Sequence, residues 1–262
     1  MRDLPIEGGV LRVRGVELAC RQFGSGPPLL MLHGGAGPTP RAPYLDALAA
    51  HFEIILPTHP GFYGSPHHKR VGSVDDLAYL YLDLIDDFGL DDLTVMGFSM
   101  GGWLALELAT KSCARLKQLV LVDAVGVKFT DRETRQFPDI FAMAQDSVAR
   151  LMFHDPVRMA LDFAALSEEE LTAFVTNREA LIHYVWEPYL HNPKLLARLH
   201  RVAVPVACIW GDSDGLTTPG YGRQLAAALP NARFELIPQA GHAPQLEQPQ
   251  AFVAAVLAAC GP

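Results

Sequence analysis

The amino-acid sequence predicts an α/β protein whose mostly parallel sheet is covered by helices on both faces. Apolar runs that are too short for helices recur along the chain, and amphipathic segments of helical length separate them. Half of the 262 residues are apolar, which is enough to bury a large core. The length fits one large domain, or one domain that carries an insertion.

The expected strands are apolar or alternating runs bounded by turn residues. They are Val10–Arg14, Val16–Phe23, Leu29–Leu32, Phe52–Leu56, Leu93–Met96, Leu119–Val122, Val206–Trp210 and Phe234–Ile237. The first two alternate in polarity around Gly15, which indicates an antiparallel pair. The expected helices between and after the strands are Tyr44–His51, Ser73–Phe88, Trp103–Lys111 and Pro249–Ala259.

The alternation of strands and helices stops between residues 125 and 201. This stretch contains no strand pattern, and its prolines divide it into short helices rich in large apolar residues. We therefore expect an α/β core made of residues 1–124 and 202–262, with a helical insertion over residues 125–201.

Charge and cysteine content exclude several classes of protein. The formal net charge is −8 and the basic residues are scattered, so no nucleic-acid partner is expected. No run has the length of a signal peptide or a membrane span, and no Cys or His spacing indicates a metal site. The four cysteines are expected to be reduced thiols of a cytoplasmic protein. The sequence leaves both a monomer and a homodimer open.

The apolar run Leu93–Met96 leads into Gly97-Phe98-Ser99-Met100-Gly101 and then into a helix. This is the G-x-S-x-G pattern in its required context of strand, sharp turn and helix. Side chains at positions 97 and 101 would collide in so tight a turn, which explains both glycines. A serine there could simply cap the helix. The context favours Ser99 as a nucleophile.

A serine nucleophile needs a histidine as base and an acid that orients the histidine. His242 lies in the loop after the last expected strand and follows Ser99 in the chain, which is the order this arrangement requires. Asp214, in the loop after the preceding strand, is the favoured acid. Asp123, which follows the Leu119–Val122 run, and Asp212 are the alternatives.

Two backbone amides are expected to bind the oxygen of a tetrahedral intermediate. One belongs to Met100, the residue after the nucleophile. The other comes from the His33-Gly34-Gly35 loop after the Leu29–Leu32 run, where we favour the Gly35 amide. We interpret His33 as holding this loop by hydrogen bonds rather than as a base.

Five segments, MLHGGAG, PTHPGFYGSP, MGFSMGGW, WGDSDGLTTP and AGHAPQLEQP, together resemble the α/β-hydrolase superfamily. The resemblance covers nearly the whole chain outside the insertion. It implies an eight-stranded sheet, a helical cap formed by the insertion, and a Ser99–Asp214–His242 triad. It also implies that no cofactor is needed. Many relatives have the pattern P-D-x-x-G after the second core strand, where this chain has Pro57-Thr58-His59-Pro60-Gly61. The sequence indicates no function for His59.

The leading functional hypothesis is a serine hydrolase that cleaves a small apolar or aromatic ester through an acyl-enzyme. The large apolar residues of the insertion favour such a substrate. Gly34, Phe98, Tyr184 and Trp186 are the expected substrate contacts. The alternatives are a hydrolase of carbon–carbon bonds in aromatic ring-fission products, a perhydrolase, an aminopeptidase, and a ligand-binding member without catalysis.

Overall fold

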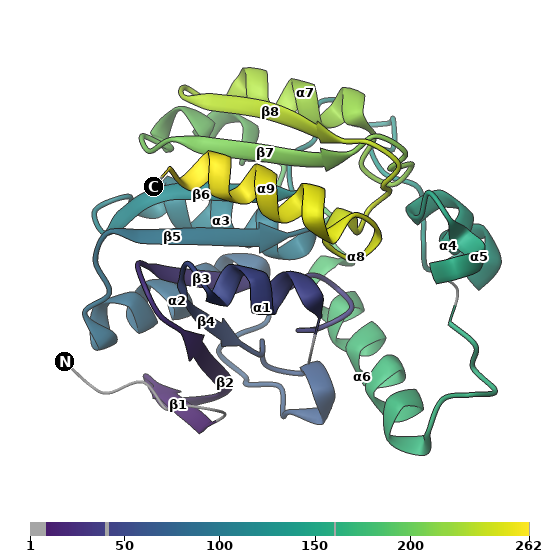
Figure 1. The fold of residues 1–262 in the computed structure, drawn as a ribbon, viewed down its shortest axis with the longest axis horizontal. Helices are drawn as coiled ribbons and strands as arrows, with labels where there is room; N and C mark the ends of the chain where they lie inside the picture. Colours follow the sequence, from purple (N-terminus) through teal and green to yellow (C-terminus); the bar gives the residue numbers. More distant parts are fainter. Residues whose placement is uncertain (1–8, 40–41, 160, 262) are drawn as a thin grey trace.

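The computed structural model describes residues 9–39, 42–159 and 161–261. Eight strands form one sheet in the order β1-β2-β4-β3-β5-β6-β7-β8 (Figure 1). The pairs β1–β2 and β2–β4 are antiparallel, and every other pair is parallel. The strands are β1 Gly9–Val13, β2 Val16–Gly24, β3 Pro28–Leu32, β4 Glu53–Pro57, β5 Leu93–Phe98, β6 Leu116–Val122, β7 Val206–Gly211 and β8 Ala232–Ile237.

Two layers of helices bury the two faces of the sheet. Figure 1 shows α1 (Pro43–Ala49) and α9 (Pro249–Cys260) in front of the sheet, with α2 (Val74–Phe88) and α3 (Met100–Lys111) behind it. The alternation of side chains along β3 explains the arrangement, because Leu29 and Met31 enter the core under α1 and α9. Leu30 and Leu32 enter the larger core on the opposite face.

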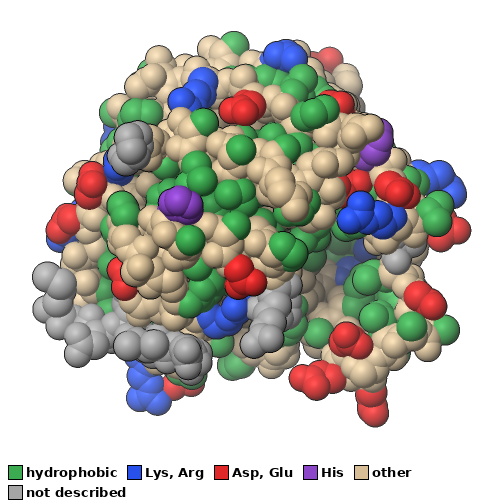
Figure 2. All heavy atoms as spheres, viewed as in Figure 1, with side chains coloured by type: hydrophobic (Ala, Val, Ile, Leu, Met, Phe, Trp, Pro, Cys, Tyr) green, Lys and Arg blue, Asp and Glu red, His purple; other side chains and the backbone are tan. Residues whose placement is uncertain are grey.

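The chain between β6 and β7 leaves the sheet and forms a group of helices, which we call the β6–β7 connection (residues 123–205). It contains α4 (Gln145–Met152), α5 (Pro156–Met159), α6 (Glu168–Val185) and the 3-10 helix η2 (Leu196–Arg201). A capping box of Ser167 and Glu170 fixes the start of α6. The helices α4, α5 and α6 lie beyond the ends of the parallel strands (Figure 1), and Figure 2 shows the surface hollowed beside them. In contrast, η2 packs against α3.

The structure confirms the predicted fold class and places a strand at every expected run. Sequence reasoning missed α7 (Pro219–Ala228), although Thr218 and Pro219 carry the usual start signal of a helix. The short helices η1 (Phe62–Gly64) and α8 (Pro244–Glu247) were not predicted either. No helix among the described residues is long and apolar enough to span a bilayer.

Candidate active site

Ser99 occupies a sharp turn between β5 and α3. Its backbone angles are φ 50° and ψ −112°, a strained conformation for a residue with a side chain. A Cβ added at Gly97 would lie 2.2 Å from the Gly101 carbonyl oxygen, and one at Gly101 would lie 2.0 Å from that of Leu32. The two glycines therefore permit the turn. The Ser99 amide donates to the Val122 carbonyl at the end of β6 over 2.9 Å, which holds the turn against the sheet.

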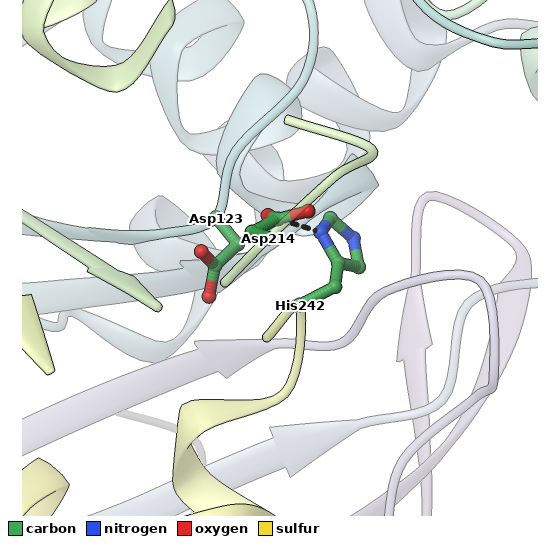
Figure 3. A group of neighbouring side chains, drawn as sticks. All are labelled: Asp123, Asp214 and His242. Carbon is green, nitrogen blue, oxygen red and sulfur yellow. Dashed lines mark hydrogen bonds and ion pairs between the residues drawn. The ribbon is translucent and has the colours of Figure 1, made fainter. Parts of the chain in front are cut away.

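Asp214 and His242 come from the loops after β7 and β8 and meet at a buried contact (Figure 3). His242 Nδ1 donates to Asp214 Oδ2 over 2.8 Å. Asp214 Oδ1 also accepts from the amides of Leu216 and Thr217, at 2.8 and 3.0 Å, and Oδ2 accepts from the Thr217 hydroxyl at 2.5 Å. The carboxylate is thus held from several sides. The other ring nitrogen of His242, Nε2, points away from it.

The loop after β3 lies against the serine. A Cβ on Gly34 would come within 3.2 Å of Ser99 Cβ, so this backbone touches the nucleophile turn. Among the residues that the structure describes, the amides of Gly35 and Met100 donate to no acceptor. Within the same residues, Ser99 and His242 are not joined by a hydrogen bond.

Two buried histidines hold the loop after β3 by hydrogen bonds. His33 Nδ1 donates to the Gly34 carbonyl over 2.8 Å, and His33 Nε2 accepts from the His59 amide over 3.0 Å. His59 in turn accepts from the Tyr81 hydroxyl over 2.5 Å and donates from Nε2 to the His33 carbonyl over 3.2 Å. Burial lowers the pKa of His33 to about 4 and that of His59 well below 6.5, so both are neutral. His59 therefore has a structural role in this chain.

The β6–β7 connection is fastened to the loop that carries His242. The His242 amide donates to the Met152 carbonyl over 2.5 Å. The buried Glu247 carboxylate accepts from the Gly241 amide at 2.6 Å, and from the amides of His154 and Asp155 at 2.9 and 3.1 Å. One carboxylate thus joins the histidine loop to the turn between α4 and α5.

One group of side chains in the described ranges has ligand atoms close enough to hold a metal ion. It consists of Asp123, Asp214 and His242, whose nearest atoms lie within 4.8 Å of one another. The His242 Nδ1 proton already binds Asp214, and both Asp214 oxygens already accept protein donors. A cation would have to displace these bonds, so we interpret the group as an acid–base network.

A sequence profile of the alpha/beta hydrolase family matches residues 29–256. The chain belongs to the alpha/beta hydrolase family. The match confirms the predicted family and the predicted enzyme class, that of a hydrolase.

Curated relatives and solved structures agree with this membership. This alpha/beta hydrolase is 30% identical over 256 residues to the pimeloyl-(acyl-carrier protein) methyl ester esterase of Chromobacterium violaceum, covering 92% of this chain and 97% of that protein. The esterase RhEst1 from Rhodococcus sp. ECU1013 has the same fold, with a TM-score of 0.77 at 19% identity and coverage of 96% and 97%. A meta-cleavage product hydrolase, CumD, matches with a TM-score of 0.74 at 19% identity, over 95% of this chain and 96% of that one.

The four residues expected to contact the substrate of this alpha/beta hydrolase lie in different surroundings. Gly34 touches the Ser99 turn, whereas half-buried Phe98 packs with its ring against the core. Tyr184 is buried and donates to the Pro60 carbonyl over 2.9 Å, so its hydroxyl is already engaged. Trp186 is 54% exposed beyond the end of α6 and contacts Phe141 and Tyr189. Tyr184 thus packs inside the protein and Trp186 lies at its surface, and a substrate contact of either residue stays a prediction.

Leu181 is the residue that sequence reasoning missed. Its side chain lies where a Cβ on Gly35 would be, with Cδ2 only 2.5 Å from that position. Asn177, one helical turn earlier on α6, donates to the Ala36 carbonyl over 2.8 Å and fixes the helix on the same loop. The period of α6 could have indicated a common face for these two residues, but nothing in the sequence indicated what that face covers.

Proposed function

We propose that this alpha/beta hydrolase cleaves carboxylic esters through an acyl-enzyme formed on Ser99. The observation that carries the proposal is the buried contact between His242 Nδ1 and Asp214 Oδ2 at 2.8 Å. It keeps the proton on Nδ1, which leaves Nε2 free to accept the proton of a serine hydroxyl. The strained turn at Ser99 and the pimeloyl ester esterase relative support the same chemistry.

In the proposed reaction, His242 Nε2 takes the Ser99 proton while Oγ attacks the ester carbonyl. The amides of Met100 and Gly35, which have no acceptor among the described residues, stabilise the negative oxygen of the tetrahedral intermediate. His242 then gives its proton to the leaving alcohol. Water, activated in the same way, attacks the acyl-enzyme and releases the acid. Asp214 stabilises the charged imidazole at both steps.

The substrate that fits best is a small ester with an apolar acyl group. The supporting contact is Leu181, an apolar side chain placed over the Gly35 end of the proposed oxyanion hole. In this proposal, residues 125–201 act as the cap that encloses the acyl group, on a core of residues 1–124 and 202–262. The cytoplasmic location, the absence of a nucleic-acid partner and the oligomeric state stay predictions.

A panel of p-nitrophenyl esters from acetate to octanoate tests this proposal. We expect measurable turnover with the native chain and a loss of about 10⁴-fold or more in Ser99→Ala. Ser147→Ala, which makes the same chemical change on α4, is the matched control and should retain full turnover. If native protein and Ser99→Ala are equally slow on every ester, ester hydrolysis by Ser99 is wrong. Bleaching of a coloured ring-fission product under those conditions would favour carbon–carbon bond hydrolysis instead.

A further inference from the structure

Asp123 is a buried carboxyl beside the proposed triad that the reaction above does not use. It follows directly on β6, is 1% exposed, and has a positive φ of 43°, which is uncommon for a residue other than glycine. Its amide donates to the Ile209 carbonyl in β7 over 3.2 Å, which ties the residue to the strand before the Asp214 loop. A strained backbone at such a place indicates that the surroundings fix the side chain.

The two oxygens of Asp123 have unequal surroundings. Oδ1 accepts from the Gly211 amide over 3.0 Å. Oδ2 is fully buried and has no hydrogen-bond partner in the described part of the chain, if both Asp123 and Asp214 are ionised. An unsatisfied charged oxygen in the interior is costly, and native proteins rarely leave one. A proton on Asp123 removes the problem, because the carboxyl then has a hydrogen to donate.

The neighbouring groups favour a protonated Asp123. Burial raises its pKa most, followed by the charge of Asp214. The Gly211 amide acts in the opposite direction, while a hydrogen bond with Asp214 and the charge of Glu247 raise the pKa further. Among the described residues, His242 also has a ligand atom within 4.8 Å of the Asp123 carboxylate. Two carboxylates this close do not both ionise readily.

Asp214 is the less suitable of the two to hold the proton. It already accepts from two amides, the Thr217 hydroxyl and the His242 ring, which are four donors in all. Asp123 accepts from a single amide. A shared proton therefore belongs on Asp123, with Asp214 as its acceptor.

We propose that Asp123 is a neutral carboxylic acid that donates a hydrogen bond to Asp214 and thereby positions Asp214 for His242. Asp123 is then a positioning residue that acts through Asp214. The arrangement leaves a single negative charge behind His242, and it gives Asp214 a fifth donor on the side away from the histidine ring. The catalytic part of this inference rests on the proposed ester hydrolysis, whereas the location of the proton does not.

Substitution of Asp123 tests the positioning role through the pH profile of ester hydrolysis. Asp123→Ala removes the donor, so kcat/KM should fall about ten- to a hundredfold. Asp123→Asn offers an oxygen to Gly211 and an NH₂ to Asp214, so it should recover most of that loss and leave the acidic limb of the profile in place. If Asp123 were ionised, Asp123→Asn would remove a charge and move that limb to lower pH. That shift, or a failure of Asn to recover activity, would overturn the proposal.

Infrared spectroscopy locates the proton without any need for activity. At pH 7 the native chain should show the C=O stretch of a neutral carboxyl, and Asp123→Asn should lack it. Asp212 is exposed, so Asp212→Asn is the matched control and should retain the band. A band that is absent from the native chain, or that is lost in Asp214→Asn but not in Asp123→Asn, contradicts the proposal. If no ester is hydrolysed but the native chain shows the band and Asp123→Asn lacks it, the proposed function is wrong and the neutral state of Asp123 is supported.

Discussion

The loops at the ends of the parallel strands and the helices α4–α6 of the β6–β7 connection lie at the same end of the strands (Figure 1). They differ in how far their side chains are buried and hydrogen-bonded. In the loops, Asp214 is buried and accepts from four donors. In the connection, Val157 is 87% exposed, Val175 60% and Trp186 54%, although all three are apolar. A fully bonded loop holds its atoms in one geometry, whereas the connection has surface that can change without breaking the core.

From this difference we infer that the loops carry out the reaction and that the β6–β7 connection selects the substrate. The proposed acid, base and nucleophile lie in the loops and the turn that follow β7, β8 and β5. The side chains of these strands fill the cores, so the positions of the three residues follow from the fold. The connection meets them through α6, where Leu181 lies over Gly35, and through the end of α4, where Leu151 and Met152 accept from the amides of Gly215 and His242. We therefore expect substitutions in the loops to change kcat by orders of magnitude. Substitutions on the outside of the connection should have little effect.

The largest effect is expected from the acid loop itself. Asp214→Asn keeps the shape of the side chain but removes the charge that stabilises the imidazolium and holds its tautomer, so kcat should fall about 10⁴-fold. Steady-state ester hydrolysis measures the loss. Asp212→Asn, an exposed aspartate in the same loop, should change kcat less than twofold. Equal activity of the two variants would contradict the assignment of Asp214.

A second effect concerns the histidines under the oxyanion loop and appears as pH-dependent stability. His33 and His59 are neutral when folded, and their folded pKa values lie below the ordinary 6.5. The unfolded chain therefore binds more protons between pH 6.5 and 4, and the free energy of unfolding falls as the pH falls. Each histidine contributes up to about 1.4 kcal/mol per pH unit.

Urea unfolding at several pH values measures this slope. His59→Gln should flatten it between pH 6.5 and 4, whereas the exposed His51→Gln should leave it unchanged. Parallel slopes for the native chain and His59→Gln would mean that the buried histidine does not resist protonation.

Glu247 joins the two regions, and its substitution should give an intermediate effect. In Glu247→Gln one acceptor oxygen becomes an NH₂ that faces backbone amides, so we expect the free energy of unfolding to fall by about 1–3 kcal/mol. Ester hydrolysis should fall about tenfold because the His242 loop loses its anchor. Thermal unfolding and kinetics measure both effects, with the exposed Glu235→Gln on β8 as control. Loss of stability without loss of activity would show that the connection does not help to place His242.

The smallest effect is expected from the exposed aromatic end of the connection. Trp186→Ala should change the free energy of unfolding by less than about 1 kcal/mol and leave kcat/KM for short esters within twofold, because the ring is half exposed. Leu181→Ala, on the face that meets Gly35, should instead raise KM for longer acyl chains. A large loss in Trp186→Ala would instead support the predicted contact between Trp186 and the substrate.

The strands and the chain order of Ser99, Asp214 and His242 could be predicted because they depend on local patterns. Apolar runs bounded by turn residues mark the strands, and the loops that follow them must meet at one edge of a parallel sheet. The positions of Tyr184, Trp186 and Leu181 could not be predicted, since they depend on how α6 docks. The partners of Asp123 and Glu247 likewise come from segments distant in the chain, and no spacing in the sequence records them.

Reaction with a fluorophosphonate, followed by mass spectrometry of the intact and digested protein, tests the central claim most directly. An activated Ser99 should take up one equivalent and carry the adduct on the peptide that contains residues 97–102. Ser99→Ala should take up none, and His242→Ala should react far more slowly. An adduct on another residue, or no adduct on the native chain, would contradict the account of Ser99 as the nucleophile.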